Sequence, residues 1–217
     1  MDFDFILRFV PMYAQAGWLT IKLATLGIIA SLALGLACAI SYYFNRPILS
    51  KIVSCYIELS RNTPLLIQLF FLYYGLPKIG IHISSFTCAL IALIFLGGGY
   101  MAESFRLGLE AIRCAQYESA LSLGLSKASA LRYVILPQAL RISLPSISAN
   151  VIFLIKETSV VSVIALADLV YATKDIIGLY YRTNEALFLL VASYLIIILP
   201  VSLGLSYLEK RLNYARA

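Results

Sequence analysis

Two charged residues stand in the middle of a long apolar stretch of this chain. The tetrapeptide Lys156-Glu157-Thr158-Ser159 lies near the centre of the run from Ser143 to Val170, which as a straight helix of roughly 28 residues would be about 42 Å long. Charges in such surroundings are costly, so they are candidates for function. Adjacent helical residues do not face each other, so Lys156 and Glu157 cannot neutralise one another. Each needs another partner, or the helix is interrupted there and lines a cavity.

The tetrapeptide offers groups that suit a small zwitterion. Lys156 and Glu157 supply one charge of each sign, and Thr158 and Ser159 add hydroxyl groups. A solute that carries both an ammonium and a carboxylate needs compensation for each charge in a low-dielectric cavity. Transporters present such groups from interrupted helices at mid-membrane. The alternative is that the two charges form structural ion pairs with other spans.

Other charged residues also fall within or beside apolar runs. Glu103 is a further candidate for a substrate pathway, or it anchors the helix by pairing with Arg106 one turn later. Glu58 and Arg61 are three positions apart, and this spacing predicts a structural ion pair.

The chain lacks the motifs of an enzyme or a metal site. It has one histidine, His82, and its four cysteines include no close pair: Cys38, Cys55, Cys88 and Cys114. Neither a P-loop nor a Gly-x-Ser-x-Gly, His-Glu-x-x-His or Cys-x-x-Cys pattern occurs. We therefore expect no catalytic, metal or cofactor site in this chain, and energy for any transport must come from a partner or an ion gradient.

The composition requires lipid as the solvent for most of the chain. Of 217 residues, 61% are hydrophobic and 13% are charged, and the mean hydropathy is +0.89. Soluble domains carry about 25% charged residues. The net charge of +6 indicates membrane topology and not nucleic acid as a partner, because lysine and arginine gather in cytoplasmic loops.

We predict an all-α polytopic membrane protein with a single transmembrane domain over residues 1–217. A span needs about 20 mostly apolar residues. The expected spans are 18–44, 56–79, 86–105, 143–170 and 186–207. Asn45, Arg46 and Pro47 should end the first span, and the polar Arg61-Asn62-Thr63-Pro64 makes the second irregular. Residues 1–17 read as an amphipathic segment on the membrane surface before the first span.

The distribution of basic residues predicts the orientation. Loops and the tail on one side carry most of them: Arg46, Lys51, Arg61, Arg106, Arg113, Lys127, Arg132, Arg141, Lys210, Arg211 and Arg216. The other side has only Arg8, Lys78, Lys174 and Arg182. The richer side should be cytoplasmic. With five spans, the N-terminus is then outside and the C-terminus is cytoplasmic.

The longest polar stretch, residues 106–141, predicts two short helices joined at Gly124. Glycine is common just past a helix end, Ser126 can cap the next helix, and Pro137 bends or ends it. Such a loop can act as a rigid knob that fits a groove in a soluble subunit. Glu118 suits the positive end of a helix, and Gly124 lets another backbone approach. The alternative is a loop helix that packs only on its own protein.

The spacing in this loop resembles a family signature. Glu118-Ser119-Ala120, three residues, Gly124, nine residues and Val134-Ile135-Leu136-Pro137 is similar to the EAA pattern of permease subunits in binding-protein-dependent ABC importers. Ser119 replaces alanine and Val134 replaces isoleucine, while the spacing is intact. Three further stretches resemble the polar amino acid permease subfamily, of the histidine, glutamine, arginine or glutamate type: residues 61–77, 99–103 and 156–159.

The resemblance implies a function and a set of partners. It implies the pore subunit of an importer for polar or charged amino acids in the bacterial cytoplasmic (inner) membrane. Its partners would be two ABC ATPase subunits that bind ATP and magnesium, a second permease subunit (identical or related) and an extracytoplasmic solute-binding protein. The residues expected to contact the ATPase are Tyr117, Glu118, Ser119, Ala120, Leu121 and Gly124. An ABC importer for another small solute and a gradient-driven transporter or channel remain as alternatives.

Overall fold

The computed structural model describes residues 1–44, 47–112 and 114–213, and every regular element in them is helical. The predictions that involve Asn45, Arg46, Arg113 and Arg216 lie outside these residues. The longer helices are α1 (Phe3–Tyr43), α2 (Pro47–Asn62), α4 (Ser85–Glu110), α7 (Leu136–Glu157), α8 (Leu169–Tyr180) and α9 (Thr183–Asn213). The shorter ones are α3 (Leu65–Phe70), η1 (Phe71–Gly75), η2 (Leu76–Ile79), α5 (Cys114–Ser122), α6 (Lys127–Ala130), η3 (Leu131–Ile135) and η4 (Thr158–Ile164).

Four helical segments are long and apolar enough to cross a membrane: Phe3–Tyr43, Ser85–Glu110, Lys127–Ile164 and Thr183–Leu212. They correspond to the first, third, fourth and fifth expected spans. The second expected span, 56–79, is not one helix, because Thr63 and Pro64 separate α2 from α3. Proline has no N–H to donate and keeps the preceding residue out of the helical region. The number of membrane crossings therefore stays a prediction.

The N-terminal residues do not form a separate surface segment as expected. They are the start of α1, which is capped by Asp2 and continues through Pro11. Tertiary packing explains the continuity, since Ile6, Tyr13 and Ala16 are buried against α8 and α9. The hydroxyl of Tyr13 also donates to the carbonyl oxygen of Ala186 at 2.9 Å.

The fourth expected span ends earlier than residue 170. After η4, Ala165 adopts a left-handed conformation with φ of 55°. Asp168 then caps a separate helix, α8, by accepting the backbone N–H of Tyr171 at 2.9 Å. The apolar run therefore continues through residue 170 in the sequence, but the helix does not.

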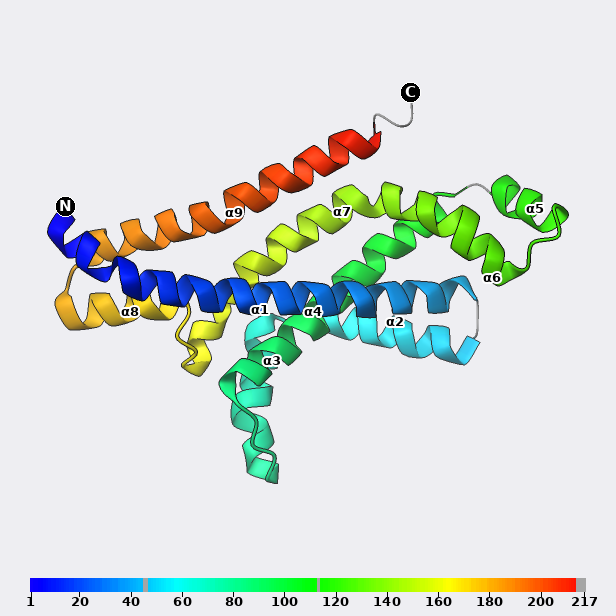
Figure 1. Cartoon of the computed structure of the whole chain (residues 1–217). Coiled ribbons are helices and arrows are strands. Elements are labelled where there is room, and N and C mark those ends of the chain that lie inside the picture. Colours follow the sequence, from blue (N-terminus) through cyan, green and yellow to red (C-terminus); the bar gives the residue numbers. More distant parts are fainter. Residues whose placement is uncertain (45–46, 113, 214–217) are drawn as a thin grey trace.

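The core forms where α1 crosses α4, and glycines allow these two helices to approach closely. A Cβ on Gly35 would lie 2.5 Å from the Cβ of Met101 and 2.7 Å from the backbone nitrogen of Ala102. A second, separate cluster joins the N-terminal part of α1 to α8 and α9. In Figure 1 the N-terminus and the turn between α8 and α9 lie at one end of the molecule, and α5 and α6 lie at the other.

Candidate functional site

A cavity of about 320 Å³, here called the central cavity, lies where α2, α3, α4, α7 and η4 meet. It is lined by Arg61, Asn62, Thr63, Pro64, Leu65, Leu66, Leu96, Tyr100, Phe153, Glu157 and Val160. Arg61 and Glu157 thus give it one charge of each sign, from different helices. Small-molecule sites in proteins begin at about this volume and combine apolar walls with a few polar groups.

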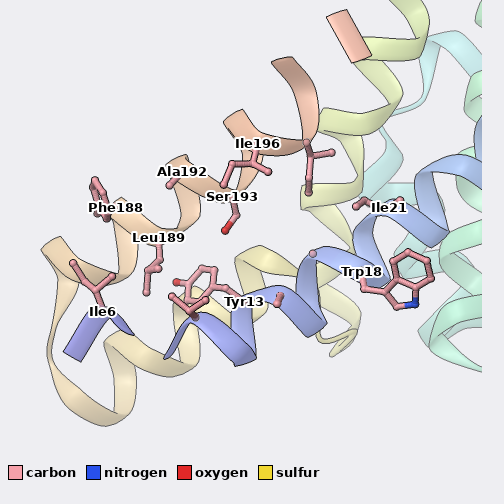
Figure 2. A pocket seen from close by; sticks show the side chains of 13 residues that line it. Ile6, Tyr13, Trp18, Ile21, Phe188, Leu189, Ala192, Ser193 and Ile196 are labelled. Atoms are coloured by element: carbon pink, nitrogen blue, oxygen red, sulfur yellow. The ribbon is translucent and has the colours of Figure 1, made fainter. Parts of the chain in front are cut away.

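The cavity between α1 and α9 differs in its lining. Its volume is about 460 Å³, and its walls are almost entirely apolar side chains such as Ile6, Leu189 and Ile196 (Figure 2). Trp18 lies at its edge and is 68% exposed. Such a surface suits lipid chains and offers little to a polar solute.

Arg61 lies in the last turn of α2 and lines the cavity, and Gln68 of α3 holds the turn that follows this helix in place. The Nε2 atom of Gln68 donates to the hydroxyl of Thr63 at 2.9 Å and to its carbonyl oxygen at 3.1 Å. It also lies 3.3 Å from the carbonyl oxygen of Ser60. These bonds satisfy carbonyl groups that the end of α2 leaves without helical partners. The break that divides the second expected span therefore shapes the cavity.

Of the tetrapeptide 156–159, Glu157 is the residue that lines this cavity. It shares a face of the chain with Phe153 and Val160, which lie four residues before and three after it. Lys156 is exposed and points elsewhere. The hydroxyl of Thr158 is buried and donates to the carbonyl oxygen of Ile155 at 2.7 Å, and Ser159 is half-buried. The helix changes from α to 3-10 geometry between Glu157 and Thr158.

Glu103 lies behind the cavity wall and connects Arg61 to the rest of α4. Its Oε1 atom is 2.6 Å from Nη2 of Arg106, which confirms the pair expected one turn apart. Its Oε2 atom is 3.6 Å from Nη1 of Arg61. Arg106 also pairs with Glu110 at 2.8 Å. The expected pair of Glu58 with Arg61 is replaced, since Glu58 accepts from Asn62 Nδ2 at 2.9 Å.

The loop between α4 and α7 folds into two short helices, as its turn residues predict. At the end of α5, Gly124 has φ of 82° and donates to the carbonyl oxygen of Leu121 at 2.9 Å, and Leu125 donates to that of Ala120 at 3.2 Å. This pair of bonds is the Schellman motif. Ser126 caps α6 by accepting the N–H of Ser129 at 3.2 Å.

The six residues expected to contact a partner lie mainly on the outside of α5. Glu118, Ser119, Leu121 and Gly124 are exposed, and Ala120 is buried. The Tyr117 ring packs edge-on against Tyr43, with ring centroids 6.1 Å apart, so α5 also contacts the end of α1. A Cβ on Gly124 would meet no atom within 4 Å. The surface of α5 around this glycine is therefore free to receive another backbone.

Pro137 neither ends nor interrupts the helix at the base of this loop. The preceding residues Leu131–Ile135 form a single π-helical turn, and α7 begins at Leu136 with the proline in its first turn. A π turn shifts the hydrogen bonds by one residue, and proline is tolerated where a helix begins. The α6, η3 and α7 helices therefore follow one another without a break.

Sequence reasoning misses two residues that shape the cavity. Helical spacing assigns Arg61 to a local ion pair, and it gives Gln68 no role. The available indication is Pro64 within the polar stretch 61–64, because a proline there predicts a turn that redirects its neighbours. Which helix those neighbours meet depends on tertiary packing.

Several apolar helices, a charged central cavity and an exposed pair of short helices at one end together define a membrane transport subunit. The match to the family described as "Binding-protein-dependent transport system inner membrane component" covers residues 8–214. The chain belongs to this family. Its members are the membrane-spanning components of ABC importers, in which a partner subunit hydrolyses ATP.

Individual relatives share nearly the full length of the chain. It is 35% identical to a probable amino-acid ABC transporter permease protein, PatM, of Vibrio harveyi, over 99% of this chain and 97% of the relative. It is 34% identical to the glutamine transport system permease protein GlnP of Escherichia coli K12, over 98% of this chain and 99% of the relative. A crystal structure of an amino acid ABC transporter with histidines matches with a TM-score of 0.89 and 36% identity, over 97% and 99% of the two chains.

Proposed function

We propose that this chain forms half of the transmembrane pore of an importer for polar or charged amino acids. The observation that carries the proposal is the central cavity with Arg61 and Glu157 in its wall. An amino acid needs one partner of each sign in a low-dielectric site. Relatives named for amino acid and glutamine transport support this cargo class.

Within the cavity, Glu157 is the partner for the ammonium group of the cargo. Thr158 and Ser159, which follow in η4, are further candidates for the pathway, although neither lines this cavity. Lys156 is a further candidate for the pathway, although it is exposed and does not line this cavity. Glu103 belongs to the same pathway through its contact with Arg61.

The α5 helix is the proposed contact for the partner ATPase. Tyr117, Glu118, Ser119, Ala120, Leu121 and Gly124 form or border its surface. Closure of an ATPase pair would move α5, and the continuous α6–η3–α7 segment would carry that motion to Glu157. A second permease subunit would complete the pore, and an extracytoplasmic binding protein would deliver the cargo.

The proposed orientation places α5 and α6 in the cytoplasm and the turn between α8 and α9 outside. These two parts lie at opposite ends of the molecule (Figure 1). In a background without native cysteines, Tyr181→Cys should react with an impermeant maleimide in intact cells, since Tyr181 is 87% exposed. Ser126→Cys should react only after permeabilisation. Labelling of Ser126→Cys in intact cells would overturn the orientation.

The proposed function is tested by purification and uptake. An ABC ATPase subunit should co-purify with the tagged chain, and proteoliposomes holding the complex and its binding protein should take up labelled amino acids only with ATP inside. A panel of L-glutamine, L-arginine, L-glutamate and L-histidine covers the polar and charged classes. Uptake that follows an ion gradient without ATP would indicate a gradient-driven transporter. ATP-dependent uptake of another solute only would remove the amino acid assignment.

A further inference from the structure

The guanidinium of Arg61 has far fewer partners than it can bind. It lines the central cavity, its side chain is 36% exposed, and it lies over the ring of Tyr100 at 5.3 Å from the ring centroid. Among the described residues its one charged contact is Glu103 Oε2 at 3.6 Å, and no hydrogen bond to the guanidinium is formed. A guanidinium presents five N–H donors in a fixed fork that matches a carboxylate. The N–H donors of the Arg61 guanidinium therefore lie in the cavity wall almost without hydrogen-bond partners among the described residues.

The carboxylate of Glu103 pairs more closely with Arg106 than with Arg61. The distances from its carboxylate are 2.6 Å and 3.3 Å to Arg106, against 3.6 Å to Arg61. The longer contact is the weaker one. If Arg61 turned toward a ligand, Glu103 would still be paired with Arg106, so the movement would leave no carboxylate without a partner. Tyr100 would keep the guanidinium plane in place, because arginine stacks on aromatic faces.

The same cavity also has an anionic residue in its lining. Glu157 comes from the end of α7, and within the described residues it forms no ion pair. Lys156 is exposed outside the cavity lining. The cation that lines the same cavity as Glu157 is therefore Arg61 of α2, and the two charges come from segments far apart in the sequence. This arrangement is complementary to a zwitterion with an ammonium at one end and a carboxylate at the other.

We propose that Arg61 binds the α-carboxylate of the cargo amino acid and that Glu103 acts as the positioning residue that holds Arg61 when the cavity is empty. The proposal rests on the proposed function of amino acid import. On loading, the carboxylate replaces Glu103 as the partner of Arg61 and forms two parallel hydrogen bonds with it. Glu103 remains on Arg106. A compound that keeps the ammonium and side chain but lacks the carboxylate charge should lose this contact.

The test compares pairs of ligands that differ only in the α-carboxylate. The probes are L-glutamine, L-arginine, L-glutamate and L-histidine, each with its α-amide, added to the detergent-purified complex of this chain with its ATPase. Binding is measured by calorimetry without the binding protein. For the wild type, at least one amino acid should bind roughly 10- to 100-fold more tightly than its amide, since a charge-assisted bidentate pair is lost.

Four variants separate binding from a structural role. Arg61→Met should reduce the preference for the free acid over the amide to about twofold or less, and Arg61→Lys should retain part of it, because lysine keeps the charge without the fork. Glu103→Gln removes a competing carboxylate, so the free acid should bind about two- to fivefold more tightly. Arg8→Met is the matched control, since Arg8 also lies over an aromatic ring, at 6.0 Å from the centroid of Phe9, away from the cavity.

The opposite responses of Arg61→Met and Glu103→Gln distinguish the proposal from a simple ion pair. If Arg61 only stabilised α4, both variants would lower the melting temperature and neither would change the preference for the free acid. Full retention of that preference in Arg61→Met would therefore overturn the proposal. In that case ATP-dependent uptake by the wild type would still support the proposed function. A wild type that co-purifies with the ATPase but binds none of the four amino acids would contradict both.

Discussion

The α5–α6 loop and the central cavity differ in how the sequence specifies them. In the loop, the turn is set by residues at the turn itself: Gly124 in a left-handed conformation and Ser126 as a helix cap. In the cavity, the two charges come from α2 and α7, and Gln68 on α3 holds the turn that follows α2. Local chemistry is sufficient for the first region, whereas the second exists only when distant helices have packed.

The largest expected effect comes from Gly124→Asp, which tests whether the loop works through its surface. Aspartate adds bulk and charge where another backbone approaches, so uptake should fall by at least about 100-fold, or about 2.7 kcal/mol. The chain should remain folded, because nothing lies within 4 Å of the new Cβ. Uptake and ATPase co-purification on one preparation provide the measurement.

Gly80→Asp is the matched control for this substitution. Gly80 also follows a helix, has φ of 85°, and a Cβ added there would likewise meet no atom within 4 Å. Backbone strain is therefore alike at the two sites, while only Gly124 lies on the α5–α6 loop. Equal losses of uptake in both variants would show that strain, and not the surface, explains the effect at Gly124.

Glu157→Gln tests the cavity as the cargo site. Loss of a charge-assisted contact to an ammonium should weaken cargo binding by about 10- to 100-fold, in line with about 1.5–3 kcal/mol for such a bond. ATPase assembly should persist. Glu58→Gln is the control, because Glu58 is exposed on α2 and does not line the cavity. Wild-type uptake kinetics together with a lowered melting temperature would assign Glu157 a structural role.

A pair of glutamine substitutions contrasts the two regions directly. Gln68→Leu removes the bonds that hold the turn after α2, and we expect a loss of about 1–3 kcal/mol together with weaker cargo binding. Gln138→Leu removes a single bond from Gln138 Nε2 to the carbonyl oxygen of Val134, 2.8 Å long, within one helix. It should cost less and leave cargo binding unchanged. Both variants are measured by thermal unfolding and by calorimetry. A larger loss of stability or of cargo binding in Gln138→Leu than in Gln68→Leu would contradict the comparison.

The smallest expected effect is a pH dependence at Asp168, between the α7–η4 segment and α9. Burial raises the pKa of this carboxyl to about 6, against the opposing effects of the Tyr171 backbone N–H and Lys174. The folded state thus holds the proton more tightly than the unfolded state, so stability is greatest below about pH 4 and declines as pH rises toward 6. Asp168→Asn still caps α8. It should raise the melting temperature at pH 7.5 by about 2–8 °C and flatten its pH profile, and an unchanged profile would contradict the assignment.

Much of the fold follows from the sequence for identifiable reasons. Long apolar runs predict membrane helices, and four of the five expected spans correspond to such helices. The pair of Glu103 with Arg106 follows from helical spacing alone. The spacing from Glu118 to Pro137 also indicates the family, and the match over residues 8–214 confirms it.

The remaining features depend on contacts that sequence spacing does not encode. Residues 1–17 look like a surface segment by themselves, and only burial against α8 and α9 makes them part of α1. In the run from Ser143 to Val170 the charged tetrapeptide 156–159 suggests an interruption, whereas the chain leaves the helical conformation only at Ala165, within an apolar stretch. Arg61 could have paired with Glu58 on its own helix, yet it extends to α4 because α2 and α4 pack together.

The length of α1 has a mechanical consequence. Its 41 residues form a continuous rod about 62 Å long. Near one end its Tyr13 is tied to α8 and α9, and at the other its Tyr43 meets Tyr117 of α5. A rod of this length is a lever: a tilt of about 5° about its crossing with α4 would displace the two ends by about 5 Å relative to each other in opposite directions. A small movement of the Tyr43 end of α1, next to α5, would thus displace its Tyr13 end in the opposite direction, and α1 would stay folded.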